Sequence, residues 1–267
     1  QSSFLETSYL LLFGRLPTRP ELDRWTSDIT HHRRIKFRIN DLLKCLPETG
    51  HPMDALQAAV AALGMFYPGR QVKDAENNYW SAVRLIAKLP TIVAAWARLR
   101  RGNDPIPPQD DLEFSENFLY MLTEHAPHPL WKDIFDDCLI LHAEHTMNAS
   151  TFTGLVTAST LADPYTVVAS SIGALKGPLH GGANEEVIHM LREIASPERA
   201  RTYVEQKLAG KQKLMGFGHR VYKVKDPRAT ILQGLCERLF KECGPSPLYA
   251  VALEVERVAG ELLQRKG

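Results

Sequence analysis

Two glycine-rich segments of the chain each carry a histidine, and the first spans residues 176–185 with the sequence KGPLHGGANE. His180 is followed there by Gly181 and Gly182, and Asn184 can cap the helix predicted to follow. Glycine lets a ligand approach the backbone closely, at a cost in conformational entropy that an ordinary connector need not incur. A histidine can donate a hydrogen bond to an oxygen on which negative charge develops. From local chemistry alone, a functional His180 and an exposed histidine in an ordinary helix–helix turn are equally good interpretations.

The second segment spans residues 214–228 and reads LMGFGHRVYKVKDPR, with His219 near its centre. The Gly-Phe-Gly element at residues 216–218 exposes backbone N–H and C=O groups that can bind a flat heterocycle or a phosphate. The element lacks the Gly-x-Gly-x-x-Gly spacing and no predicted strand precedes it. A dinucleotide-binding fold is therefore disfavoured.

Arg228 lies in the first turn of a predicted helix, because Asp226 can cap that helix and Pro227 suits its first position. A cation at a helix N-terminus opposes the helix dipole by about 0.3–1 kcal/mol. A bound carboxylate or phosphate would remove this conflict, and the guanidinium fork could bind it through two hydrogen bonds. Pairing of Arg228 with a nearby acidic side chain explains the position equally well.

His145 continues the apolar stripe formed by Ile134, Cys138 and Leu141 at helical spacing, so we expect its side chain to point inward. A histidine on such a face is more often a satisfied core residue than a ligand. Asn148, three residues further on, adds a second polar group at the same predicted helix end.

The histidines and cysteines do not predict a metal site. His142 and His145 lie three residues apart, but no third ligand follows at a recognised spacing. The four cysteines include no Cys-x-x-Cys pair and are too sparse for a disulfide scaffold. This usage fits a reducing, cytoplasmic compartment.

The elements that must position these groups are predicted to be helices. Pro164, Pro197 and Pro227 each follow a residue that can cap a helix N-terminus, and glycines follow the predicted ends. Apolar residues recur with a period of 3.6, and strand-like alternation bounded by turn pairs is absent. We therefore predict an all-α fold, in which Pro90 kinks or splits the helix expected over residues 78–101.

Composition excludes several classes of protein. The 267 residues carry 32 basic and 31 acidic side chains, and a net charge of +1 favours neither nucleic acid nor a membrane as a partner. With 44% hydrophobic and 24% charged residues, the chain has a globular composition and is not intrinsically disordered. Its apolar runs are far shorter than the roughly 20 residues of a membrane span. The basic run at residues 31–34 is interpreted as a solvated helix end.

Taken together, these motifs resemble the citrate synthase family nearly from one end of the chain to the other. The matching segments are PLHGGANE at 178–185, GFGHRVYK at 216–223, DPR at 226–228, LHAEH at 141–145 with Asn148, LADPY at 161–165, YLLLFG at 9–14 and LPT at 16–18. The resemblance implies a helical protein with a large domain over residues 1–180, a small domain over 181–267, and an active site in the cleft between them.

The implied reaction condenses acetyl-CoA with oxaloacetate to give citrate and CoA. By this resemblance His180 hydrogen-bonds the thioester oxygen of the enol intermediate, and His219 polarises the carbonyl of oxaloacetate. Arg228 and His145 hold oxaloacetate, with Asn148 in a supporting place.

The resemblance also implies how the co-substrate acetyl-CoA is bound. Lys223 is expected to contact a phosphate of CoA. The residues expected to contact its adenine through their backbone are Leu214, Met215, Gly216, Phe217 and Gly218. A permanently bound cofactor and a metal are not expected, and a homodimer is the expected minimal assembly.

The chain departs from the family pattern at its end. The carboxylate base of the family is an aspartate that should follow just beyond Gly267, and the chain begins with Gln1, so both ends are expected to be truncated. We therefore expect this polypeptide alone to have little or no synthase activity. The sequence leaves open a 2-methylcitrate synthase acting on propionyl-CoA, and a non-catalytic module that binds CoA or oxaloacetate or serves interactions.

Overall fold

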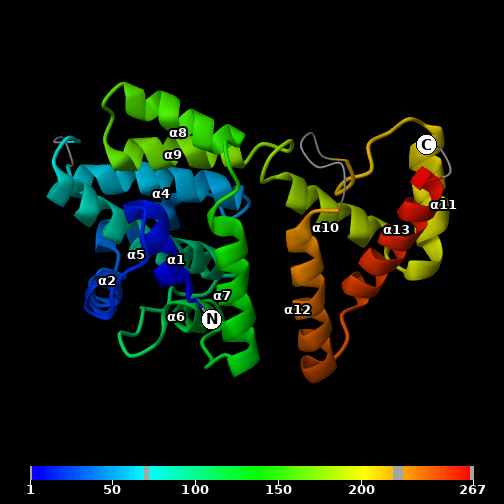
Figure 1. Cartoon of the computed structure of the whole chain (residues 1–267), viewed down its shortest axis with the longest axis horizontal. Helices are drawn as coiled ribbons and strands as arrows, with labels where there is room; N and C mark the ends of the chain where they lie inside the picture. The colour runs from blue at the N-terminus through cyan, green and yellow to red at the C-terminus, as the bar shows by residue number, and fades with distance from the viewer. Residues whose placement is uncertain (1, 69–71, 219–224, 265–267) are drawn as a thin grey trace. The chain divides into compact units, whose positions relative to one another are not determined.

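A computed structural model describes residues 2–68, 72–218 and 225–264. Within this part of the chain every regular element is an α-helix and no strand occurs, which confirms the predicted all-α class (Figure 1). Two predicted site residues, His219 and Lys223, lie outside the described residues. None of the helices described is both long and apolar enough to cross a membrane.

The described helices follow one another along the chain with short connections. Their bounds are α1 (Phe4–Phe13), α2 (Arg19–His31), α3 (Phe37–Cys45), α4 (Pro52–Phe66), α5 (Ala75–Leu99), α6 (Phe114–Thr123), α7 (Pro129–Ala143), α8 (Ala149–Ser159), α9 (Pro164–Leu175), α10 (Ala183–Ile194), α11 (Pro197–Ala209), α12 (Pro227–Cys243) and α13 (Pro247–Gln264). The predicted helix starts at Pro164, Pro197 and Pro227 are confirmed.

Contacts divide the chain into two compact units, Gln1–Lys176 and Gly177–Gly267, which we call unit 1 and unit 2. Unit 1 contains α1 to α9, and unit 2 contains α10 to α13. The assignment of a large and a small domain with a boundary at residue 180 stays a prediction.

The main core of unit 1 lies where α4 and α9 meet α5, around the fully buried side chains of Leu63, Ile92 and Tyr165. Figure 1 shows α8, α9 and α4 stacked beside one another in this unit. Small residues let these helices approach closely: a Cβ added to Gly154 of α8 would lie 2.8 Å from the Oγ of Ser171 on α9. A larger residue at position 154 would therefore require the side chain of Ser171 to move.

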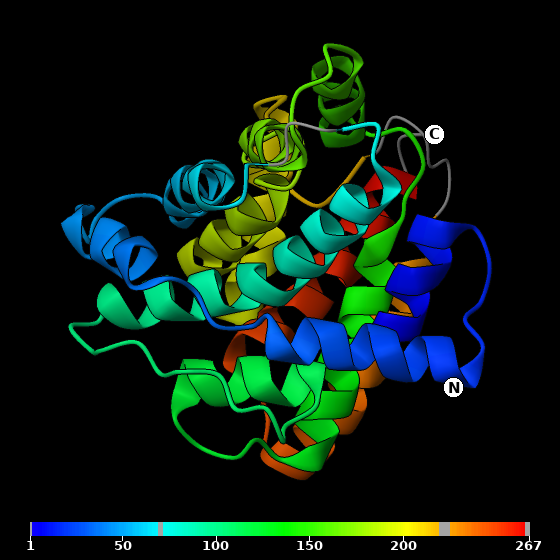
Figure 2. The same ribbon diagram turned by 90° about the vertical axis from the view of Figure 1, so that its left-hand side faces the viewer.

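A second core of unit 1 surrounds Trp25, whose side chain is fully buried between α1, α2 and α5. Its indole Nε1 donates a hydrogen bond to the Oγ of Ser8 at 3.1 Å, so the polar edge of the ring is satisfied. In Figure 2, where unit 1 faces the viewer, α5 runs as a long helix through this packing.

Pro90 does not split α5, which continues from Ala75 to Leu99, so of the two predicted effects the split was wrong and the kink stays a prediction. Proline removes only one backbone hydrogen bond. The helix buries side chains on both sides of the proline, including Leu85 and Ile92. Packing of this kind offsets the loss and keeps the helix continuous.

Arg33 corrects the interpretation of residues 31–34 as a solvated helix end, because its side chain is only 2% exposed. Its NH1 donates to the carbonyl oxygens of Gln109 and Leu112 at 2.9 and 2.7 Å. Arg33 thus connects the end of α2, through two hydrogen bonds, to the segment that precedes α6.

The core of unit 2 forms between α10, α11 and α13 and includes the fully buried Ile194, Val204 and Val258. Helix α12 contributes little to it, and Leu235 is its one buried residue among those described. The hydroxyl of Tyr249 on α13 donates to the carbonyl oxygen of Gln233 on α12 at 3.4 Å.

Candidate functional site

His180 lies in a tight turn between α9 and α10. The carbonyl oxygen of Gly177 accepts hydrogen bonds from the backbone N–H groups of His180, at 2.9 Å, and of Gly182, at 3.1 Å. Helix α10 then begins at Ala183 with Gly182 as its N-cap, so the expectation that Asn184 caps this helix was wrong. The half-buried His180 is therefore placed by a hydrogen-bonded turn and not by a loose loop.

The segment 214–218 turns its side chains towards the core of unit 2. Leu214 is buried, and Met215 and Phe217 pack against the same core. Gly216 and Gly218 are exposed and have φ angles of 85° and 81°, in the left-handed region that favours glycine. The side chains of the segment thus contribute to the core, whereas its two glycines stay exposed.

Arg228 lies in the first turn of α12, as predicted, and the acid that caps the helix also binds its side chain. The carboxylate of Asp226 accepts the Arg228 backbone N–H at 2.9 Å. Its Oδ1 and Oδ2 also accept hydrogen bonds from Nε and NH2 of the guanidinium at 3.1 and 2.7 Å. In this structure, pairing with a nearby acid therefore explains how a cation is tolerated at the N-terminus of α12.

His145 does not continue the stripe of α7, and this expectation is corrected. The helix ends at Ala143, and Glu144 follows in an extended conformation with φ −144°. His145 lies beyond the helix, half-buried in the connection to α8, where helical spacing no longer describes its direction. Asn148 caps α8, and its Oδ1 accepts from the backbone N–H of Thr151 at 3.0 Å.

The predicted site residues divide between the two units. His145 and Asn148 belong to unit 1, whereas His180, Arg228 and the segment 214–218 belong to unit 2. The structure describes each group within its own unit, and their meeting in one cleft stays a prediction. Among the described residues, no cluster of three or more histidine, cysteine or acidic side chains could hold a metal ion.

Comparison with known proteins decides the family. The family model described as citrate synthase, C-terminal domain, matches residues 1–267. The chain belongs to the citrate synthase family. It is 59% identical over 266 residues to the citrate synthase of Synechocystis sp., covering 100% of this chain and 67% of that protein. It is 50% identical to the citrate synthase of Acidithiobacillus ferridurans, covering 100% of this chain and 71% of that protein.

Solved structures of citrate synthases share the fold. The structure from Pyrobaculum aerophilum matches with a TM-score of 0.87 and 41% identity over 96% of this chain and 66% of that chain. The citrate synthase of Thermoplasma acidophilum, solved as a ternary complex with carboxymethyl coenzyme A and oxaloacetate, matches with a TM-score of 0.91 and 31% identity. That match covers 99% of this chain and 70% of the other. The chain is therefore an enzyme of the citrate synthase type.

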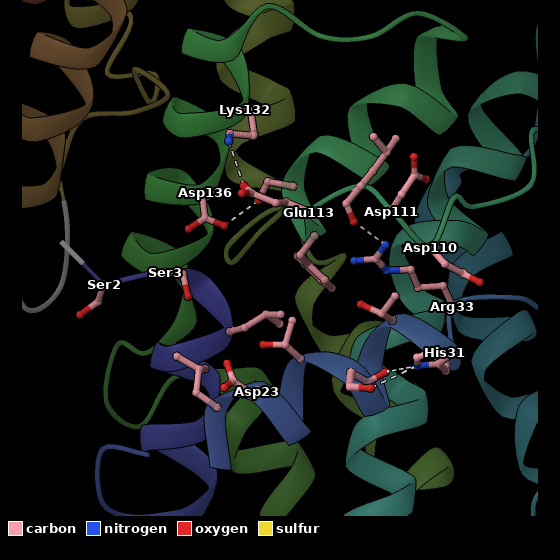
Figure 3. A pocket seen from close by; sticks show the side chains of 18 of the residues that line it. Ser2, Ser3, Asp23, His31, Arg33, Asp110, Asp111, Glu113, Lys132 and Asp136 are labelled. Carbon is pink, nitrogen blue, oxygen red and sulfur yellow. Dashed lines mark hydrogen bonds and ion pairs between the residues drawn. The ribbon is translucent and has the colours of Figure 1, made fainter. Parts of the chain in front are cut away.

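A cavity of about 820 Å³ in unit 1 contains none of the site residues expected for a citrate synthase (Figure 3). Several of the charged groups that line it already have partners. The Nζ of Lys132 lies 2.9 Å from the Oε2 of Glu113, and Asp136 accepts a hydrogen bond from the Oγ of Ser115 at 2.6 Å. Arg33 donates to backbone carbonyls at the same wall. These contacts pair part of the polar lining within the protein itself.

Proposed function

We propose that the protein condenses acetyl-CoA with oxaloacetate and hydrolyses the citryl thioester to citrate and free CoA. The likeness to the Thermoplasma acidophilum enzyme carries this proposal, because that protein holds a coenzyme A derivative and oxaloacetate in one complex. It extends over 99% of this chain. Acetyl-CoA acts as a co-substrate in this reaction, and no metal takes part.

In the proposed reaction, His180 donates a hydrogen bond to the thioester oxygen as a carboxylate base removes a methyl proton. Negative charge builds on that oxygen, and one preorganised donor of this kind contributes about 2.7–4 kcal/mol to the transition state. The turn around His180 supports this role, since two hydrogen bonds to the carbonyl of Gly177 restrain the backbone that carries the imidazole.

The keto acid is held and activated by the other predicted residues. His219 polarises the carbonyl of oxaloacetate and protonates the alkoxide that forms with the new carbon–carbon bond. Arg228 and His145 bind oxygen atoms of oxaloacetate, and Asn148 supports them. The partly exposed position of Arg228 at the start of α12 is compatible with carboxylate binding.

CoA binding rests on the segment 214–218 and on Lys223. Gly216 and Gly218 are exposed and carry no side chain of their own, which suits close contact of their backbone with the flat adenine ring. Lys223 binds a phosphate of CoA in this proposal. Side chains of Leu214 and Met215 support the segment from the core.

We also propose that the active site lies in a cleft between a large domain, residues 1–180, and a small domain, 181–267. The protein works as a homodimer, and an exposed apolar face on α8 supports this assembly. Phe152, Leu155 and Val156 are 60%, 53% and 52% exposed at helical spacing on that face. Bacterial relatives such as those named above support a cytoplasmic location.

The experiment that tests the function measures the release of free thiol from acetyl-CoA in the presence of oxaloacetate. The full-length natural protein is used. His180→Ala should lower kcat by about 10²–10³-fold, the loss typical of an oxyanion donor. His189→Ala is the matched control, because this histidine lies on α10 with an exposed side chain and should leave turnover unchanged. Full retention of a measurable wild-type turnover by the His180 variant contradicts the proposal.

Propionyl-CoA in the same assay discriminates the related 2-methylcitrate reaction. Propionyl-CoA and acetyl-CoA differ by one methylene group, and a hydrophobic pocket discriminates between two such substrates by only about 1–3 kcal/mol of transition-state binding. We expect kcat/KM to be higher for acetyl-CoA. A preference for propionyl-CoA would reassign the substrate, and binding without turnover of either thioester would indicate a non-catalytic module.

A further inference from the structure

An ion pair at the last residue of unit 1 joins two elements that are far apart in the sequence. The Nζ of Lys176 lies 2.6 Å from Oδ1 and 2.7 Å from Oδ2 of Asp54. Asp54 occupies the first turn of α4, and Lys176 is the C-cap of α9. Each charge complements the dipole of the helix end that carries it. The pair therefore closes one end of the contact between α4 and α9.

The two helices that the pair joins are packed tightly over several turns. A Cβ on Gly173 of α9 would lie 2.7 Å from the side-chain nitrogen of Gln57 on α4. One Cβ on Gly64 of α4 would lie 3.3 Å from the Cβ of Tyr165 on α9. The backbone N–H of Lys176 still bonds to Ile172 at 3.0 Å. Both the backbone N–H and the side-chain ammonium of Lys176 are thus hydrogen-bonded, the first within α9 and the second to Asp54 on α4.

The residues after Lys176 leave little freedom before His180. Gly177 follows directly, and its carbonyl accepts the two hydrogen bonds that close the turn around His180. Pro178 has a φ angle fixed by its ring. Lys176 and His180 are therefore separated by a short segment whose backbone is restrained by a proline ring and by two hydrogen bonds.

We propose that the Asp54–Lys176 pair is a positioning device that fixes the start of the turn carrying His180. This inference rests on the role given above to His180 in catalysis. Neither side chain of the pair touches substrate. The pair acts by holding the end of α9, so that His180 is presented in one position when the thioester enol forms.

The pair is partly exposed, with 37% of the Lys176 side chain and 54% of the Asp54 side chain accessible. Exposed pairs contribute little to stability. We therefore expect Asp54→Asn and Lys176→Gln to lower kcat two- to fivefold, equivalent to about 0.4–1 kcal/mol. The KM for oxaloacetate should stay within twofold of wild type, because Arg228 and His145 are untouched.

Three comparisons separate positioning from a general loss of structure. The double variant should be no slower than either single variant, because each change breaks the same contact. High salt should lower wild-type kcat towards that of the variants and leave the variants unchanged. Asp110→Asn is the matched control, since Asp110 binds NH1 of Arg34 in unit 1 at 2.7 and 2.9 Å and is 42% exposed.

Amide hydrogen exchange gives a readout that does not depend on activity. The N–H groups of His180 and Gly182 should exchange several-fold faster in Asp54→Asn than in wild type, and at the wild-type rate in Asp110→Asn. The inference is overturned if Asp54→Asn leaves both the exchange rates and kcat unchanged. It is also overturned if Asp54→Asn and the control Asp110→Asn have equal effects. If His180→Ala retains full turnover, the proposed function fails, whereas the exchange result still decides whether the pair holds the turn.

Discussion

The carboxylate of Asp226 caps α12 and also holds the guanidinium of Arg228, with 2.7 Å between Oδ2 and NH2. One acid therefore satisfies a backbone N–H at the helix start and balances a cation that the helix dipole disfavours. The arrangement keeps an arginine fork at the start of α12, and it constrains where an incoming carboxylate can bind.

The first prediction concerns this arginine. Arg228→Lys keeps the charge but loses the planar fork, so bidentate recognition of a carboxylate is lost. We expect the KM for oxaloacetate to rise about tenfold, equivalent to roughly 1.4 kcal/mol, and the KM for acetyl-CoA to change less. Steady-state kinetics with each substrate varied in turn measures both constants.

Asp226→Asn serves as the stability control for that experiment. Asparagine caps a helix about as well as aspartate, but this change removes the charge that balances Arg228, so the free energy of unfolding should fall by about 0.3–1 kcal/mol. If Arg228→Lys raised both KM values equally, the assignment of Arg228 to oxaloacetate would be wrong.

The second prediction concerns Lys88, which is 3% exposed and donates from Nζ to the carbonyl oxygens of His32 and Arg34 at 2.6 Å. Burial lowers the pKa of Lys88 from its usual 10.5 to about 8, and the positive charges of Arg84 and Lys36 act in the same direction. Between pH 8 and 10.5 the unfolded chain keeps a proton that the folded protein has lost. The free energy of unfolding contributed by this residue therefore rises with pH.

Lys88→Met removes this titration. Relative to the variant, wild type should gain on the order of 2–3 kcal/mol of unfolding free energy between pH 7.5 and pH 10. Urea unfolding at a series of pH values measures the difference. Lys44→Met is the control, because about half of the Lys44 side chain is exposed, and its curve should run parallel to that of wild type. A parallel curve for Lys88→Met would refute the prediction.

The third prediction concerns the apolar face of α8. A homodimer that uses this face buries Leu155, so Leu155→Glu places a charge in an apolar interface and should convert the dimer to a monomer. Sedimentation velocity measures the change. Phe37→Glu on α3 alters a side chain that is 70% exposed and should leave the assembly as in wild type. A dimer that survives Leu155→Glu would place the interface elsewhere.

Helix starts were predictable because their signals are local. An acid or serine followed by proline, as at Asp163–Pro164, supplies the side-chain cap and a fixed φ angle within three residues. Helix ends depend on what the following residues contact, and His145 shows the consequence. Counting by 100° per residue placed it on α7, but the backbone turns to an extended conformation at Glu144.

Long-range contacts explain the other differences between the predictions made from the sequence and the structure. Nothing near Arg33 indicates that its partners are the carbonyls of Gln109 and Leu112, which lie more than 70 residues away. The Asp54–Lys176 pair joins residues 122 positions apart, and no local sequence pattern indicates it either. The motifs therefore indicate candidate site residues, whose roles stay predictions, whereas the contacts that hold those residues required the fold.

In the segment 214–218 the side chains of Leu214, Met215 and Phe217 pack in the core of unit 2, whereas Gly216 and Gly218 are exposed. Substitution of Leu214 or Phe217 is expected to alter the folding of unit 2 before it alters recognition, since both side chains belong to its interior. A library designed to change the proposed acyl-CoA specificity would therefore gain little from randomising Leu214 and Phe217, and would do better to vary residues whose side chains face the ligand.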